Sequence, residues 1–348
     1  MLIRIWLTLK QHRFETIAVV VLCLIAAVTS LVEVYRLNSV HLPASCLLDG
    51  RAVFATGGTY GATSQSTACQ LAIDRFNAIA YGTDMSLIRT LAVLLPFIVG
   101  ILFGAPLVAK EIEQGTAPLS WALVGSRRRW LLGKMVAVIL LIVPLLLVAG
   151  LAADVLQGAL TPGTDPHASF ENFSFRGVMI VFWGLAALLG TVALGTLIGR
   201  TLPAVLVALV LCFLARGLWE PLLNRTVLPP FAVMQSQDTE NQNGGYGWSP
   251  SDLYVYYRTY LDGKPWDGDL NAWWNAHQPP MIVDPSGGVQ PDPNAPAFDP
   301  SQTPQQVQFV IHGDRYWPIV ALESGILFLG ALFCGAVALV WVDRRRPY

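Results

Sequence analysis

Charged side chains are scarce in this chain of 348 residues, of which 13% are charged and 54% hydrophobic. A soluble domain usually carries about 25% charged residues, because its surface faces water. The deficit excludes an ordinary soluble protein and indicates a membrane protein. The formal net charge of -1 also excludes a strongly basic protein that binds nucleic acid.

The motifs of several enzyme classes are absent as well. The nearest approach to a phosphate-binding loop, Gly133-Lys134-Met135, lacks both the first glycine and the hydroxyl that would bind magnesium. The sequence contains neither Gly-x-Ser-x-Gly nor His-Glu-x-x-His, and no spacing of Cys and His indicates a metal site. We therefore expect no catalytic residue, metal or cofactor on this chain, and an intramembrane enzyme is disfavoured.

The chain instead contains six apolar runs, each long enough to cross a bilayer as a helix. They cover approximately residues 15–35, 86–109, 131–156, 178–200, 202–220 and 318–342. The sequence therefore predicts an all-α polytopic membrane protein with six transmembrane helices. The first run is long and no clear cleavage site follows it, so we interpret it as a retained helix rather than a signal peptide.

Basic residues indicate how the helices are oriented, because short loops rich in Lys and Arg stay in the cytoplasm. These residues precede the first run, separate the second from the third and the fourth from the fifth, and follow the sixth. Both termini are therefore predicted to be cytoplasmic, with residues 36–85, 157–177 and 221–317 facing outward. The basic residues are Arg4, Lys10, Arg13, Arg127, Arg128, Arg129, Lys134, Arg200, Arg344, Arg345 and Arg346.

The predicted extracellular segment 221–317 is acidic and rich in tyrosine and tryptophan. Its aromatic residues interleave with polar ones, a composition that suits either a small packed cap or a belt at the membrane interface. The fold and role of this segment stay open. It also supports an alternative function, a membrane receptor or scaffold that binds a ligand through its extracellular segment.

The five cysteines divide according to the predicted topology. Cys23, Cys212 and Cys334 lie within apolar runs, whereas Cys46 and Cys69 share the first outer loop. The outer face of a cell is oxidising, so we predict a disulfide between Cys46 and Cys69. Closing a loop of about 23 residues would stabilise the fold by about 3 kcal/mol.

The connection between the second and third runs is the most informative part of the chain. Lys110, Glu111 and Glu113 carry a helix out of the membrane, and the sequence Gln114-Gly115-Thr116 breaks it. Pro118 then opens a short, mostly apolar helix that ends near Val124. An exposed helix of this composition is expected to bury its surface in the membrane interface or in a groove on another protein.

This connection resembles the ABC-2 type permease family, in the form common in actinobacterial genomes. The resemblance is carried by residues 104–116, Trp121, residues 126–130 and Lys134. It implies a coupling helix, within cytoplasmic segment 110–130, that fits a groove on a separate ATP-binding subunit. The residues placed on or beside that contact are Glu111, Glu113, Gly115, Thr116, Pro118 and Trp121, flanked by Arg127, Arg128 and Arg129.

The resemblance also implies the partners and the direction of transport. The chain would be the permease subunit of an exporter in the cell membrane, paired with a second copy or a paralogue, and ATP and magnesium would bind the partner subunits. An amphipathic helix over residues 1–14 would lie on the inner membrane surface, with residues 318–348 forming the last helix and a basic tail. The sequence does not select among a lipid, a drug and a peptide as the substrate.

Ionisable residues within apolar runs are costly and are therefore candidates for function. Glu33, Arg89, Arg216, Glu220 and Glu323 all lie near the outer ends of their helices. We hypothesise that Arg216 or Arg89 pairs with Glu323 or Glu33 to form an outer gate. The alternative for Glu33, Arg89 and Glu220 is that they reach the outer interface without such a role.

Overall fold

The structure is a computed structural model in which the chain divides into two compact units. One unit comprises Met1–Glu220 with His312–Tyr348, and the other comprises Pro221–Ile311. The residues described are 10–42, 47–48, 51–52, 67–124, 126–162, 165–234, 252–261, 263–277, 281–283, 289–291 and 304–344. Residues 1–9 of the predicted amphipathic helix 1–14 lie outside the described residues, and so does Cys46.

Six helices of the described chain are long and apolar enough to cross a membrane, as predicted. The chain is therefore a polytopic membrane protein. Five of the helices extend beyond the predicted spans, because their polar ends are helical too, whereas α7 lies within its predicted span. They are α2 (Arg13–Ser39), α4 (Thr83–Glu113), α6 (Arg127–Leu160), α7 (Met179–Ile198), α8 (Thr201–Thr226) and α11 (Tyr316–Arg344).

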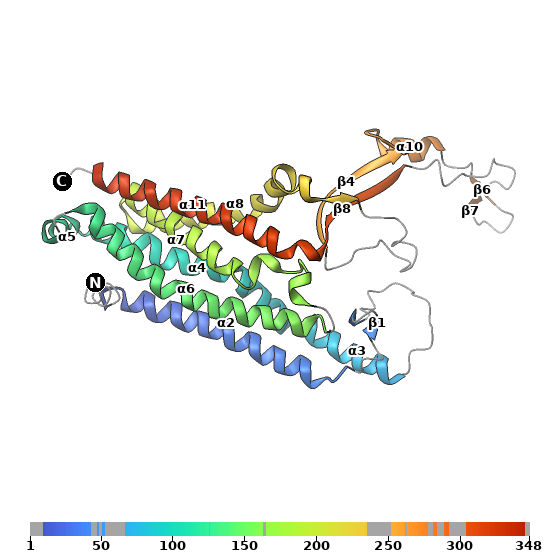
Figure 1. Ribbon diagram of the computed structural model, residues 1–348, viewed down its shortest axis with the longest axis horizontal. Helices are drawn as coiled ribbons and strands as arrows, with labels where there is room; N and C mark the ends of the chain where they lie inside the picture. Colours follow the sequence, from blue (N-terminus) through green and yellow to red (C-terminus); the bar gives the residue numbers. More distant parts are fainter. Residues whose placement is uncertain are drawn as a thin grey trace. The chain divides into compact units, whose positions relative to one another are not determined.

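The helices of the first unit form a bundle whose two ends differ in character (Figure 1). At one end lie the start of α2, the short helix α5 (Ala117–Val124) and the end of α11; we call this the α5 end. Ion pairs join neighbouring helices at this end, as between Arg128 of α6 and Asp343 of α11 at 2.7 Å, and between Lys110 of α4 and Glu15 of α2 at 4.0 Å. The basic connections therefore gather at one end, as their spacing predicted.

The opposite end of the bundle, the α3 end, carries more structure than the sequence predicted. Helix α3 (Thr67–Ala80) occupies part of the connection between α2 and α4, and strands β1 (Leu47–Leu48) and β2 (Arg51–Ala52) form a short hairpin there. The connection between α6 and α7 contains two short 3-10 helices, η2 (Pro166–Ala168) and η3 (Phe173–Phe175), and η6 (Gly313–Arg315) precedes α11.

The core of the bundle forms where α4 packs closely on α7. The small residue Gly104 permits this approach, since a Cβ there would lie 1.9 Å from the hydroxyl oxygen of Thr191. The Thr191 hydroxyl donates a 2.9 Å hydrogen bond to the Gly100 carbonyl of α4. Closely packed membrane helices typically have small residues at their contact. They also have hydroxyl groups that donate hydrogen bonds to a backbone carbonyl of the neighbouring helix.

Helix α8 packs much less tightly than α7 and exposes most of its apolar side chains. In a bilayer such side chains face lipid or another membrane helix, since lipid tails are as apolar as leucine. Its exposed apolar residues are Leu202, Leu206, Val207, Leu209, Val210, Leu211, Phe213, Leu214, Leu218 and Leu222.

The second unit contains an antiparallel four-stranded sheet, a fold that the sequence did not predict. Its strands lie in the order β3 (Val233–Met234), β8 (Gln305–Ile311), β4 (Leu253–Leu261) and β5 (Lys264–Pro265). Across β4 and β8 the rings of Tyr256 and Phe309 stack at 4.6 Å. The unit also contains η4 (Pro229–Phe231), α10 (Leu270–His277) and the hairpin of β6 (Met281–Val283) and β7 (Val289–Pro291).

Candidate functional site

The turn between α4 and α5 has the conformation that its glycine predicts. Gly115 has a φ of +71°, in the left-handed region that terminates many helices. The backbone N–H groups of Gly115 and Thr116 donate hydrogen bonds to the carbonyls of Ile112 and Glu111, at 3.2 and 3.0 Å. Glycine at this position therefore lets the chain leave α4 and enter α5 within three residues.

We expect Gly115→Ala to destabilise the protein by about 1 kcal/mol, because an L side chain is strained at this φ. The space around Gly115 is open, so the expected cost is conformational rather than steric. Gly133→Ala is the matched control, since Gly133 lies within α6 and is equally open. Thermal unfolding in detergent compares the two, and equal melting temperatures would contradict the prediction.

Helix α5 has an inner and an outer face. On the inner face Ala117 is buried, and Trp121 packs edge-on against Trp130 of α6 with ring centroids 6.1 Å apart. On the outer face Pro118 and Leu119 are exposed, and Leu119 is 68% exposed. Trp121 is turned toward the bundle, where it positions α5, and its predicted place on or beside a partner contact stays a prediction.

A buried ion pair joins α4 to α6 directly behind α5. Lys134 donates to the carboxylate of Glu111, and its ammonium lies 4.7 Å from the Trp130 ring. The second carboxylate oxygen of Glu111 accepts a hydrogen bond from the Ser120 hydroxyl of α5 at 3.4 Å. Glu111 therefore links α5 to the start of α6.

Replacement of Lys134 by methionine should destabilise the protein by about 2 kcal/mol, because it leaves the Glu111 carboxylate partly buried without its cation. The double variant Lys134→Met/Glu111→Gln should recover part of this loss. Lys110→Met is the control, since Lys110 is half-exposed and lies 4.0 Å from Glu15. Unfolding in mixed micelles measures all three, and an unchanged Lys134→Met variant would show that the pair contributes nothing.

His12 lies buried beside this ion pair at the start of α2. Burial lowers the pKa of His12, and the charge of Lys134 lowers it further, while Glu15 at 3.6 Å opposes the shift. His12 is therefore neutral at pH 7 and adds no charge to the α5 end.

Glu113, the last residue of α4, contacts the start of α8. Its carboxylate accepts a 2.9 Å hydrogen bond from the backbone N–H of Thr201, the first residue of α8. Free N–H groups at a helix start favour such an acceptor. Sequence spacing could not reveal this link, since 88 positions separate the two residues.

Two of the three arginines after α5 connect α6 to α11. Arg128 pairs with the Asp343 carboxylate at 2.7 Å, and Arg127 donates to the Asp343 carbonyl at 3.3 Å. The Arg127 guanidinium also lies 4.6 Å from the Trp121 ring, whereas Arg129 is exposed. The predicted coupling residues thus gather at the α5 end, where Glu111 contacts α6, Glu113 contacts α8 and Arg127 contacts α11.

The hypothesised outer gate does not form in this structure, because each charged group has another partner or none. Arg216 pairs with Glu220 at 2.7 Å, one helical turn away, and Glu33 pairs with Arg36 at the same distance. Glu323 accepts a 3.0 Å hydrogen bond from the indole N–H of Trp219. Arg89 makes no ion pair with any described residue, and a gating role for these residues stays a prediction.

An apolar cavity of about 390 Å³ lies among α4, α7, α8 and α11. Its lining includes Phe97, Trp183 and Trp219, whose rings contact in sequence at centroid distances of 5.4 and 5.1 Å. A cavity of this size and composition matches those that bind small apolar molecules. The sequence did not reveal it, because four separate helices build it.

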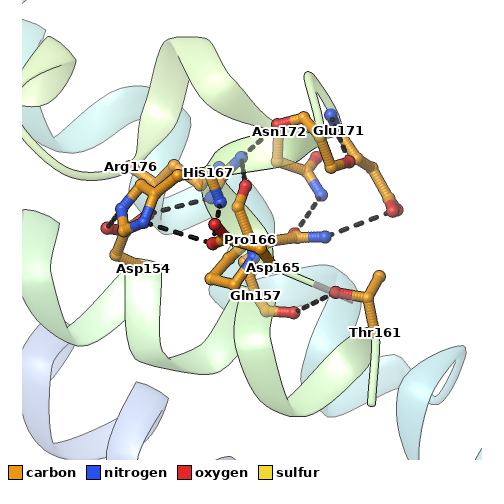
Figure 2. A network of polar contacts seen from close by, with 10 residues as sticks. Asp154, Gln157, Thr161, Asp165, Pro166, His167, Glu171, Asn172 and Arg176 are labelled. Carbon is orange, nitrogen blue, oxygen red and sulfur yellow. Dashed lines mark hydrogen bonds and ion pairs between the residues drawn. The ribbon is translucent and has the colours of Figure 1, made fainter. Parts of the chain in front are cut away.

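A polar network at the α3 end was also missed by the sequence analysis (Figure 2). Arg176, which is 1% exposed, donates to Asp154 of α6 at 2.9 Å and to the carbonyls of Pro166, at 2.6 Å, and Ser169. The second oxygen of Asp154 contacts His167 at 2.8 Å. These contacts fix the connection between α6 and α7 against α6.

Aromatic residues attach the same connection to the start of α11. The His167 ring stacks on Trp317 at 5.0 Å, and the Arg176 guanidinium lies 5.1 Å from the Tyr316 ring. The only local signal was the grouping of Asp, His, Glu and Arg between two apolar runs. The partners on α6 and α11 are distant in sequence, so this signal did not identify them.

Cys69 lies buried in α3 and is disulfide-bonded. Its predicted partner Cys46 lies outside the described residues, so the pairing of these two cysteines stays a prediction. Cys23, Cys212 and Cys334 are free thiols within helices, as their positions predicted.

Six helices long and apolar enough to cross a bilayer, with a short helix at one end of the bundle, define a polytopic membrane protein. A family model described as ABC-2 membrane transporter related matches residues 14–224. The chain belongs to this family, which confirms the resemblance to ABC-2 type permeases. No curated protein and no solved structure matches the chain.

Proposed function

We propose that this chain is the membrane-spanning permease subunit of an ATP-binding-cassette exporter in the cell membrane. Two copies, or one copy and a paralogue, pair with two ATP-binding subunits. ATP and magnesium bind those subunits, and hydrolysis occurs there. The apolar cavity among α4, α7, α8 and α11 supports a substrate with a substantial apolar part, such as a lipid, a hydrophobic drug or a peptide.

The proposed orientation rests on the distribution of basic residues. Lys110, Arg128, Arg129 and Lys134 belong to the α5 end, as does Arg200 in the tight turn before α8. Because such residues are retained in the cytoplasm, the α5 end and both termini are cytoplasmic in this proposal. The second unit then faces outward.

The observation that carries the proposal is the way α5 is held. Its outer face presents exposed Pro118 and Leu119, which suits a groove on a protein partner. Behind it, Glu111 connects to α6, Glu113 to α8 and Arg127 to α11. A displacement of α5 would therefore be transmitted to α4, α6, α8 and α11 as a rigid-body movement.

Purification of the tagged chain from native membranes, in mild detergent, tests this function. A stoichiometric ATPase with a phosphate-binding loop should accompany the wild-type chain. Glu113→Arg should weaken the association, because it places a cation beside the start of α8 and beside the docking face. Its control is Asp74→Arg, the same charge change in α3 at the opposite end of the bundle.

A wild-type chain without any ATPase, under conditions that keep other exporters intact, would contradict the proposal. The receptor or scaffold function would then be favoured, with the four-stranded sheet and its Tyr256 and Phe309 stack as the ligand-binding surface.

A further inference from the structure

A second cavity, of about 80 Å³, lies at the α3 end among α2, α4, α6 and η3. We call it the arginine cavity, because two arginines line it. Its polar lining consists of Ser30, Arg89, Gln157, Asn172 and Arg176. The remaining walls are mostly apolar side chains, among them Ile88, Val93 and Leu156.

Both arginines leave donors unused there. Arg176 donates through its two terminal nitrogens to Asp154, Pro166 and Ser169, but its buried Nε has no hydrogen-bond partner among the described residues. The Nε of Arg89 is likewise buried and without a partner in the described chain. The Arg89 guanidinium lies 6.0 Å from the centroid of the Tyr81 ring.

No carboxylate of the described residues forms an ion pair with Arg89. Asp154 is shared by Arg176 and His167, and Glu171 accepts a 3.2 Å hydrogen bond from the Gln157 amide. Glu33 of α2 pairs with Arg36 at 2.7 Å through one oxygen. Its second oxygen has no hydrogen-bond partner among the described residues, but Glu33 does not line the cavity. Asp154 offsets the charge of Arg176, so the cation of Arg89 remains without an ion-pair partner beside largely apolar walls.

A cation in such a place is costly unless an anion joins it. The geometry points to the arginine cavity as a binding site for the anionic headgroup of a membrane lipid, a phosphate or carboxylate held chiefly by Arg89 with Arg176 Nε as a second donor. Arginine is the side chain that best matches the geometry of these two oxyanions.

The size and walls of the cavity support a lipid as the source of the anion. Water occupies about 30 Å³ in the liquid, so the cavity has room for a group of several heavy atoms but not for a whole lipid. The headgroup would occupy the cavity, and its acyl chains would lie along apolar helix surfaces. A free phosphate would satisfy the arginines but not the apolar walls.

Binding of phosphatidylglycerol to the delipidated full-length chain, measured by native mass spectrometry, tests this site. Arg89→Gln should weaken binding at least about tenfold, the value of one lost charge-assisted hydrogen bond. Ala92→Leu, which fills the cavity and keeps both cations, should weaken it too. Arg75→Gln is the matched control, because Arg75 is exposed on α3 at the same end.

The measurement is repeated with inorganic phosphate as a competitor and with phosphatidylcholine as a neutral lipid. Binding that prefers phosphatidylglycerol, depends on Arg89 and resists inorganic phosphate would establish the lipid site. Displacement by inorganic phosphate would overturn the lipid assignment and leave a site for free oxyanions. Equal binding to wild type, Arg89→Gln and Arg75→Gln would overturn the site itself. Unchanged thermal unfolding of each variant confirms that it has folded.

Discussion

Leu119→Asp is expected to abolish coupling to the ATP-binding subunit without unfolding the permease. Leu119 of α5 is 68% exposed, so the substitution removes little contact within the chain. A carboxylate in the centre of a docked apolar helix would be buried without a partner. We expect the affinity between the two subunits to fall at least about thirtyfold, the equivalent of a lost interface hot spot.

The matched control for this substitution is Leu71→Asp on α3. Leu71 is 60% exposed on a helix at the opposite end of the bundle, so the change in polarity is the same. Affinity is measured by biolayer interferometry with the purified ATPase, and folding by thermal unfolding. Equal losses for Leu119→Asp and Leu71→Asp would show that α5 is not the docking surface.

Arg176→Met is expected to be among the most destabilising substitutions in the chain. Arg176 is fully buried, and its loss would leave Asp154 and the carbonyls of Pro166 and Ser169 without their donor. Removing one member of a buried ion pair costs about 3 to 5 kcal/mol, because the remaining charge stays desolvated. Titration with sodium dodecyl sulfate in mixed micelles measures the free energy of unfolding.

Two further variants show whether the network acts through charge. Arg176→Met/Asp154→Asn should be more stable than Arg176→Met alone, because it removes the unpaired carboxylate. Arg75→Met should leave stability unchanged, since Arg75 is exposed. If Arg176→Met behaved like Arg75→Met, the connection between α6 and α7 would not depend on this arginine.

The membrane architecture was predictable because its signal is local. A helix in lipid satisfies its own backbone, so an apolar run of sufficient length specifies a span without reference to other residues. The boundaries of α5 followed from two further local signals, the glycine at position 115 and the proline at position 118. Successive membrane helices cross in opposite directions, so every second connection lies at the same end of the bundle. The basic connections were therefore predicted to share one end.

Side-chain pairing was not predictable, because partners come from distant parts of the chain. Glu113 reaches Thr201, and Glu323 binds Trp219 instead of a cation. Trp121 illustrates a second limit, since a short apolar helix does not indicate which of its faces turns inward. The four-stranded sheet of the second unit pairs Val233 with Val310, a separation that composition alone does not encode.

The central claim is that α5 docks on a separate ATPase, and site-specific photocrosslinking in intact cells tests it most directly. A photoreactive amino acid replaces Leu119 in one strain and Leu71 in a second, and the crosslinked proteins are identified by mass spectrometry. We predict a crosslink to an ATPase with a phosphate-binding loop from position 119 and none from position 71. The absence of that ATPase at position 119, or its capture from position 71, would contradict the account.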